Sequence, residues 1–263
     1  YITTLGRGGS DFTASILGAS LKADEIWIWT DVNGIMTADP KIVPEARTLP
    51  VLSFDEAAEM AYFGAKVLQP YMLEPAKREN IPIRVKNTFN PEADGTLILK
   101  RCKGDDKHIV KAVCLNNDVL LLTIRDLTTE SMERIIQLIR FLIRRNIECI
   151  LLSQSFPEGN LSLIIPKSKS SQILDALNKF GSIKTEIEDD ISLIAVIGSG
   201  MRGTPGVAAK IFQSVAEKGV NIRVIVQGPS ELSIAFVVKK YDGVNAVKAI
   251  HDKFELNKVE YHG

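Results

Sequence analysis

The sequence lacks net charge, long apolar runs and paired cysteines, and each absence excludes a class of protein. Lys and Arg together number 32, as do Asp and Glu, so no net field draws the chain toward nucleic acid or an anionic membrane. No apolar run is long enough to span a bilayer. The three cysteines, Cys102, Cys114 and Cys149, form no CxxC pair and lie near apolar segments, which predicts buried thiols in a reducing compartment. We therefore expect a cytoplasmic protein that binds neither nucleic acid nor membrane.

The length and the first residues of the chain suggest more than one domain and a missing start. With 263 residues, of which 45% are hydrophobic, the chain is long for one core and suits two or three domains. It opens directly in what reads as a strand and a loop, YITTLGRGGSD, without an initiator methionine. We expect that the N-terminal part of a larger protein is absent.

Residues 1–100 alternate helix and strand patterns. Apolar residues recur at helical spacing in 11–21 and 54–63, and Ser53 followed by Glu56 predicts a capping box at the second helix. Strand patterns occupy 25–30, 81–85 and 95–99. This alternation predicts a mostly parallel α/β sheet. The polar residues 101–108, RCKGDDKH, then form a linker.

After the linker, one pattern of elements occurs twice at an offset of about 73 residues. Each copy reads as strand, helix, two strands and helix, the order of a ferredoxin-like βαββαβ unit. The expected elements of the first copy are 119–124, 129–145, 149–152, 161–165, 170–180 and 183–187. Those of the second copy are 191–197, 205–218, 222–226, 232–238 and 244–254. We expect the two units, or two chains, to pair through sheet edges.

The segment GSGMRG, from Gly198 to Gly203, matches the GxGxxG pattern of dinucleotide-binding proteins. That pattern also requires an acidic residue at the end of the next strand, where this sequence has Gln227. A dehydrogenase that binds NAD(P) here is therefore an alternative that the residues disfavour. The exposed N–H groups of these glycines, at a helix N-terminus, would suit a carboxylate instead.

The opening loop TTLGRGGSD combines flexible glycines with the fixed charge of Arg7. A guanidinium and close-lying backbone N–H groups suit a carboxylate ligand. The residues alone equally allow a glycine turn that Asp11 caps, with Arg7 in solvent. Further along, Trp27 and Trp29 are expected to pack in the core and sheet rather than to bind a base.

Three long segments resemble the aspartate kinase branch of the amino acid kinase family: TTLGRGGSDFTASIL, IWTDVNGIMTADPKIV and FDEAAEMAYFGAKVLQP. The segment VIGSGMRGTPGVAAKIF resembles an ACT domain. The resemblance implies an α/β fold: a partial amino-acid-kinase parallel-sheet domain in 1–100, followed by two ferredoxin-like ACT domains in 109–188 and 189–263. A strand in 109–115 could complete the second ACT domain, which would interleave the two.

The resemblance implies transfer of the γ-phosphoryl group of Mg-ATP to the β-carboxylate of L-aspartate. The product, 4-phospho-L-aspartate, leads toward lysine, threonine and methionine. The residues that the resemblance assigns to L-aspartate are Arg7, Gly8, Gly9, Ser10 and Asp11. Those that it assigns to ATP are Thr30, Asp31, Met36, Lys41 and Lys66. The family commonly has tyrosine and arginine where Met36 and Lys41 stand, so stacking is weaker here and the arginine fork is absent.

ACT domains of this family bind an end-product amino acid, typically lysine or threonine, between units. The resemblance assigns Asp126, Ser153 and Asn160 to such an effector, although Asp126 and Thr128 could instead cap the next helix. It also implies a homo-oligomer, expected to be a dimer, that pairs through the ACT domains. The family's catalytic lysine belongs to a KFGG segment that this chain lacks, so we expect no catalytic or metal-ligating residue and no activity in isolation. The alternative is a non-catalytic fragment that senses an amino acid.

Overall fold

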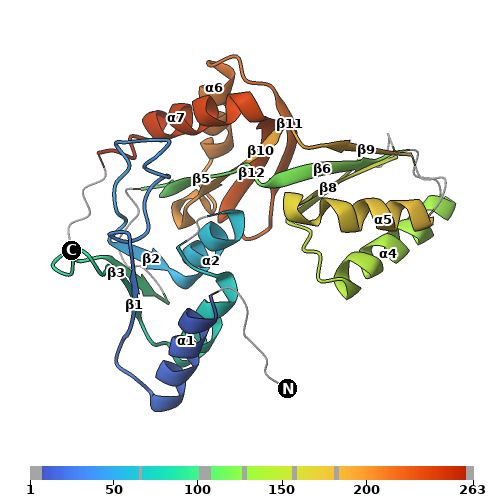
Figure 1. Ribbon diagram of the computed structural model, residues 1–263. Coiled ribbons are helices and arrows are strands. Elements are labelled where there is room, and N and C mark those ends of the chain that lie inside the picture. The colour runs from blue at the N-terminus through green and yellow to red at the C-terminus, as the bar shows by residue number, and fades with distance from the viewer. Residues whose placement is uncertain are drawn as a thin grey trace.

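A computed structural model describes residues 8–64, 67–100, 108–125, 129–155, 159–180 and 184–258. These residues form three four-stranded sheets, with helices on their faces (Figure 1). Short 3₁₀ helices connect several elements: η1 (Pro70–Met72), η2 (Lys167–Lys169), η3 (Ser199–Met201) and η4 (Lys240–Asp242). We refer to the described residues up to Lys100 as the N-terminal segment.

The N-terminal segment contains one mixed sheet and three helices. Its elements are α1 (Gly9–Leu21), β1 (Ile26–Thr30), β2 (Val51–Ser53), α2 (Phe54–Phe63), α3 (Leu73–Glu79), β3 (Ile83–Asn87) and β4 (Thr96–Leu99). The strand order is β1-β3-β4-β2, with the two outer pairs parallel and the central pair antiparallel. The expected mostly parallel α/β sheet is therefore confirmed.

Two tryptophans of β1 lie on the open face of this sheet, contrary to our expectation of core packing. Ile26 and Ile28 are buried, whereas Trp27 and Trp29 are 50% and 45% exposed. Successive side chains of a strand point to opposite faces, so the buried isoleucines force both indoles outward. The Lys86 ammonium lies over the two rings, 5.1 and 5.8 Å from their centroids.

The first repeat unit, called here the first unit, has the predicted βαββαβ order. Its elements are β6 (Val119–Ile124), α4 (Thr129–Arg144), β7 (Leu151–Ser155), β8 (Asn160–Pro166), α5 (Ser170–Phe180) and β9 (Thr185–Glu188). The sheet order is β7-β8-β6-β9, and all three pairings are antiparallel. This is the strand arrangement of a ferredoxin-like fold.

The second unit takes its fourth strand from the segment that precedes the first. Its elements are β10 (Ile191–Ile197), α6 (Val207–Ala216), β11 (Ile222–Gln227), β12 (Ser233–Lys239) and α7 (Gly243–Lys253). In the sheet order β11-β12-β10-β5, the edge strand β5 (Ala112–Asn116) pairs antiparallel with β10. The two sheets meet where β10 contacts β6 and β11 contacts β7. The chain thus enters the second sheet, leaves it for the first unit and returns.

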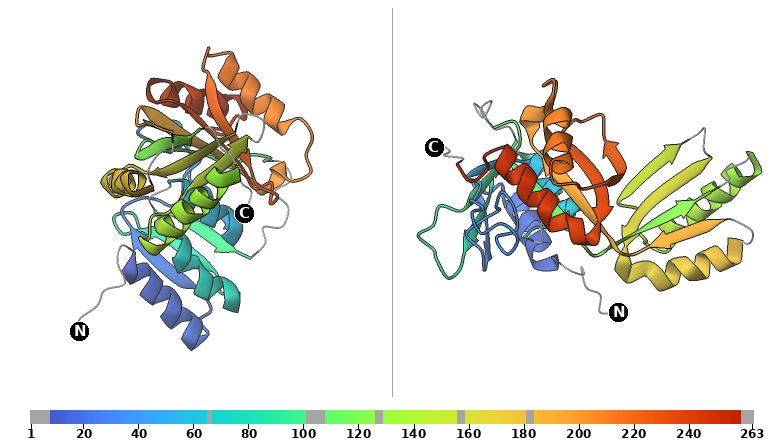
Figure 2. Two further views of the ribbon diagram at one scale, coloured as in Figure 1. Left: turned by 90° about the vertical axis from the view of Figure 1, so that its right-hand side faces the viewer. Right: turned by 90° about the horizontal axis from the view of Figure 1, so that it is seen from above.

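The sheet of the second unit is covered on both faces. Helices α6 and α7 lie on one face, and α2 of the N-terminal segment lies against β10 and β5 on the other (Figures 1 and 2). All seven residues of β10 are consequently buried. Burial of a large apolar side chain contributes about 1.5–3 kcal/mol. Buried residues of the N-terminal segment and of β10 belong to one hydrophobic cluster, so the two parts share a hydrophobic core.

Helix α2 begins with the predicted capping box. The Ser53 hydroxyl accepts a hydrogen bond from the Glu56 N–H at 3.1 Å, and the Ser53 N–H donates to the Glu56 carboxylate at 2.9 Å. Such reciprocal bonds satisfy two N–H groups that a helix start leaves without partners. The expected start of this helix is confirmed.

The Glu56 carboxylate also forms a buried ion pair across the interface with the second unit. Glu56 and Lys111 side chains are 0% and 1% exposed, and Lys111 Nζ lies 3.2 Å from Glu56 Oε2. The backbone N–H of Ser199 donates to Oε1 at 2.9 Å. Burial alone would raise the pKa of Glu56. The Lys111 ammonium and the N–H groups of Ser53 and Ser199 outweigh burial and hold this pKa below its usual value.

Within the described parts of the chain, every helix is too short or too polar to cross a membrane. The same residues contain no group of three or more His, Cys, Asp or Glu side chains that could hold a metal ion.

The buried pair predicts large stability effects. In Glu56→Gln the Lys111 ammonium stays buried opposite a neutral amide, and in Lys111→Met the carboxylate loses its cation. Because breaking a buried pair costs about 3–5 kcal/mol, we expect each variant to lower the free energy of unfolding by that amount in urea denaturation. The double variant should lose less than the sum of the two.

The neighbouring pair of Asp55 and Lys77, with side chains 54% and 39% exposed, provides the control. Asp55→Asn should cost at most about 1 kcal/mol. The low pKa of Glu56 stabilises the fold above the ordinary value of 4.5, and this contribution is lost as pH falls through the folded-state pKa. Glu56→Gln should therefore weaken the acid dependence of stability. An equal cost for Glu56→Gln and Asp55→Asn would contradict the prediction.

Candidate functional site

The glycine loop at the start of α1 is packed tightly against the segment after α2. Gly8 is the N-cap of α1, with a left-handed φ of 75°, and no side chain caps the helix. A Cβ at Gly8 would lie 2.6 Å from Gln69 Cγ. Asp11 lies in the first turn and accepts a hydrogen bond from the Ser10 hydroxyl at 3.2 Å. Asp11 is thus an acidic residue of the first turn rather than the N-cap itself, and its charge complements the helix dipole.

Helix α1 brings this loop to the carboxyl end of β1. Gly18, near the end of α1, packs against Ile26 at the start of β1, because a Cβ there would lie 2.5 Å from the Ile26 side chain. The helix and the strand run in opposite directions (Figure 1), so the helix start lies beside the strand end. Thr30 and Asp31 stand at that end, and the Thr30 hydroxyl donates to Asp31 at 3.2 Å. The candidate residues for L-aspartate and for ATP thus share one edge of the sheet.

The segment 31–48, called here the nucleotide loop, carries two further ATP candidates. Met36 is half-buried and packs against the core of the second unit. Lys41 is exposed, and its N–H donates to the Asp39 carboxylate at 2.9 Å. Arg7 and Lys66, the remaining cations predicted for the site, lie outside the described residues.

Sequence reasoning missed an amide network at the same edge. Asn87, at the end of β3, donates to the Asn33 side chain at 2.7 Å and accepts from the Phe89 N–H at 2.9 Å. The Phe89 ring is 83% exposed. Ligands of parallel α/β sheets bind beyond the carboxyl ends of the strands. The signal that could have identified this network was the polar residue Asn87 at the carboxyl end of β3, the strand that pairs parallel with β1.

The predicted effector residues lie on the two neighbouring strands β7 and β8. Ser153 pairs with Ser162, and Asn160 pairs with Ser155. Ser153 and Asn160 are thus diagonal neighbours on one face, a separation of about 7–8 Å in such sheets. Asp126 and Thr128 lie outside the described residues. The structure therefore brings two of the three predicted effector residues together.

The glycines of GSGMRG allow close packing against the non-strand segment that leads into β5. A Cβ at Gly198 would lie 2.4 Å from the Ile109 carbonyl oxygen, and one at Gly200 would lie 2.7 Å from Ile109 Cα. The strand β10 before the motif pairs only antiparallel, with β5 and β12. Dinucleotide binding uses a parallel βαβ unit, so the motif has a packing role here and the dehydrogenase alternative is not supported.

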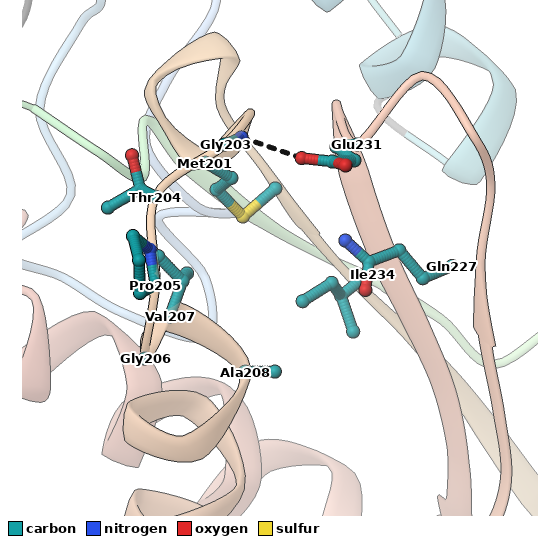
Figure 3. A pocket seen from close by; sticks show the side chains of 10 residues that line it. All are labelled: Met201, Gly203, Thr204, Pro205, Gly206, Val207, Ala208, Gln227, Glu231 and Ile234. Atoms are coloured by element: carbon teal, nitrogen blue, oxygen red, sulfur yellow. Dashed lines mark hydrogen bonds between the residues drawn. The ribbon is translucent and has the colours of Figure 1, made fainter.

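A pocket of about 330 Å³ lies beside this motif at the start of α6 (Figure 3). Its lining includes Thr204 and Gly206 on one side and Gln227 on the other. The Glu231 carboxylate accepts a hydrogen bond from the Gly203 N–H at 2.6 Å. One backbone donor of the pocket is thereby already paired with a carboxylate of the chain itself.

The two cysteines that the structure describes have no features of a reactive site. Cys114 is buried and Cys149 is half-buried, and both are free thiols. Burial raises the pKa of Cys114 to about 12. Burial and the nearby Glu148 carboxylate raise the pKa of Cys149 to about 11. Since the thiolate is the nucleophile, neither thiol is activated; Cys102 lies outside the described residues.

Comparison with known proteins agrees with this architecture. The model of the amino acid kinase family matches residues 2–87, and an ACT domain model matches residues 194–254. Aspartokinase 2 of Bacillus subtilis is 36% identical over 98% of this chain. Over nearly its whole length the chain is similar to aspartokinases. Its fold matches that of E. coli aspartokinase III in complex with aspartate and ADP, with a TM-score of 0.82, 35% identity and 95% of this chain covered.

A second aspartokinase structure agrees equally well. E. coli aspartokinase III in complex with lysine and aspartate gives a TM-score of 0.80 at 34% identity and covers 96% of this chain. The chain spans 64% of the Bacillus aspartokinase and 57% and 56% of the two E. coli structures. The matched region therefore comprises less than two thirds of each of these relatives.

Gly8→Ala tests the packing of the glycine loop. A left-handed conformation costs a non-glycine residue about 1–2 kcal/mol, and the new Cβ must also displace Gln69. We expect the free energy of unfolding to fall by more than this conformational cost in urea denaturation.

Gly219→Ala is the matched control, because Gly219 has a similar φ of 69° and no atom lies within 4 Å of the position that a Cβ would take. It should show the conformational cost alone. Equal losses for the two variants would mean that the loop does not pack tightly against Gln69.

Proposed function

We propose that this chain is part of an aspartate kinase. The reaction transfers the γ-phosphoryl group of ATP to the β-carboxylate of L-aspartate and gives 4-phospho-L-aspartate. The observation that carries the proposal is that the glycine loop and the Thr30–Asp31 pair lie at the same edge of the N-terminal sheet (Figure 1). Similarity to an aspartokinase crystallised with aspartate and ADP supports the same assignment.

In this proposal the glycine loop binds L-aspartate. Arg7 forms a bidentate pair with one carboxylate of the substrate, and the Ser10 hydroxyl donates to it. Gly8 and Gly9 present backbone N–H groups at the start of α1, where the helix dipole also favours an anion. The Ser10 hydroxyl, which donates to Asp11 in the structure, would redirect its one proton to the substrate carboxylate.

The nucleotide occupies the carboxyl end of β1 and the adjacent loop. Thr30 and Asp31 lie beside the phosphates, Met36 covers a face of the base, and Lys41 and Lys66 neutralise phosphate charge. Mg²⁺ usually binds substrate phosphates and only one or two carboxylates. The ion would neutralise charge on the transferring group.

The two ACT units regulate the kinase by binding an end-product amino acid, lysine or threonine. The candidate contacts are Asp126, Ser153 and Asn160. The relative crystallised with lysine and aspartate supports an amino acid effector. We further propose that the chain forms a homo-oligomer through its ACT units, acts in the cytoplasm and serves the synthesis of lysine, threonine and methionine.

We expect the chain by itself to be inactive, because its sequence lacks one cation that the reaction needs. Phosphoryl transfer depends on positioning and charge neutralisation, and the family's KFGG lysine is not in this sequence. In a coupled ADP-release assay, we expect the isolated chain to show no turnover with aspartate and Mg-ATP. Normal turnover would refute this expectation. An inactive chain that still binds an amino acid would fit the alternative of a regulatory fragment.

The role of Lys41 is testable in the complete enzyme that contains this chain. Hydrogen bonds to charged groups contribute about 1.5–3 kcal/mol, so Lys41→Ala should raise KM for ATP by about tenfold or more. Lys41→Arg should lower KM for ATP, because its fork binds phosphate with two bonds. Neither variant should change KM for aspartate; unchanged KM for ATP in both would exclude Lys41 from the site.

Effector binding is testable on the chain as it stands. A ligand that binds only the folded state adds about 2.7 kcal/mol to the free energy of unfolding at a hundredfold excess over Kd, and so raises the melting temperature. We expect L-lysine or L-threonine to raise it saturably, and D-lysine to have no effect. Melting curves that neither L-amino acid shifts at millimolar concentration, relative to the chain alone, would contradict the proposed regulation.

A further inference from the structure

The nucleotide loop is embedded in the core of the second ACT unit. Ala38, Val43 and Ala46 of the loop are only 6%, 2% and 8% exposed. They belong to the same hydrophobic cluster as residues of α6, α7 and the turn that follows: Ile211, Val247, Ile250 and Leu256. Apolar contacts therefore hold this part of the kinase segment on the regulatory unit rather than on its own sheet.

Thr37 makes the buried polar contacts of this interface, and the Arg47 guanidinium adds a hydrogen bond to the Asn257 carbonyl oxygen at 3.2 Å. Its carbonyl oxygen accepts a hydrogen bond from the Val113 N–H of β5 at 2.8 Å. Its hydroxyl oxygen lies 3.0 Å from Nε2 of His251 on α7 and accepts from the Arg47 N–H at 3.0 Å. Thr37 and His251 are both 0% exposed. Because buried polar groups are costly without partners, each group depends on the other.

His251 is held as a neutral ring in this contact. Burial lowers its pKa, and the carboxylates of Asp252 and Glu45 only partly oppose that effect. Its second ring nitrogen, Nδ1, has no hydrogen-bond partner among the described residues. The Thr37 hydroxyl is therefore the hydrogen-bond partner of the buried imidazole among the described residues, and its loss would leave both ring nitrogens without a partner.

The position of Thr37 determines where the two ATP candidates of the loop lie. Met36 precedes it directly. Asp39, two residues later, starts a turn in which its carboxylate accepts from the Lys41 N–H and its carbonyl oxygen accepts from the Val43 N–H, both at 2.9 Å. With Val43 buried in the second unit, a shift of Thr37 moves the Met36 and Lys41 side chains together.

We propose that Thr37 and His251 are a positioning pair through which the second ACT unit holds the nucleotide loop in its ATP-binding conformation. The inference rests on the proposed function of the loop. It assigns the second unit, through α7, a direct role in ATP affinity. Aspartate binding, at the start of α1, does not depend on this contact.

The test uses steady-state kinetics of the complete enzyme that contains this chain. Thr37→Val keeps the size of the side chain and removes the hydroxyl. Since small misplacements of binding groups cost up to about a hundredfold, we expect KM for ATP to rise about tenfold while KM for aspartate stays unchanged. Thr37→Ser should restore KM for ATP, because it returns the hydroxyl.

A double-mutant cycle and a matched control separate positioning from folding. His251→Leu should raise KM for ATP as Thr37→Val does, and the double variant should be no worse than either, since both remove one bond. Lys248→Ala, an exposed position on the same helix, should match the wild type. If Thr37→Val does not give a native melting curve, His251→Leu decides the question by the same criteria.

Two results overturn the inference. One is an unchanged KM for ATP in folded Thr37→Val or His251→Leu, and the other is an equal rise of KM for ATP and for aspartate. Failure of the proposed function has a different outcome, because the wild-type enzyme would then form no aspartyl phosphate from ATP and aspartate.

Discussion

The buried carboxylate of Glu56 joins the kinase segment to the second ACT unit. It completes the capping box with Ser53, pairs with Lys111 before β5 and accepts the Ser199 N–H of the glycine motif. A buried charge is tolerable only when such partners are assembled around it. Folding of α2, entry of the chain into β5 and closure of the glycine motif therefore depend on one another.

Helix α2 extends this connection to both regulatory units. The Ser233 hydroxyl of β12 donates to Glu59 at 2.7 Å, and the Tyr62 hydroxyl lies 3.2 Å from the carbonyl oxygens of Cys149 and Ile150. The helix ends shortly before Lys66, a proposed ATP contact. Together with the nucleotide loop on α7, helix α2 thus connects the ACT units to the proposed ATP side of the site, and Gln69 beyond the helix lies against Gly8 of the glycine loop.

The sequence predicted the local elements well and the long-range partners poorly. Strand 191–197 and helix 170–180 have the expected bounds, since periodicity and caps are local signals. The three-residue strand β2 was missed because it is too short to show a period. Glu56–Lys111 and Thr37–His251 join residues 55 and 214 positions apart, and no local pattern encodes such pairs. The candidate site was found through resemblance, whereas its anchoring on α7 required the fold.

Hydrogen exchange followed by mass spectrometry tests directly whether the kinase segment and the second ACT unit are one cooperative body. Amides of α2 and of β10 should exchange with the same opening free energy, close to that of global unfolding, because they share a core and the Glu56 contacts. Exchange of α2 at a much lower free energy than β10 would show that the helix opens independently, and would contradict the account.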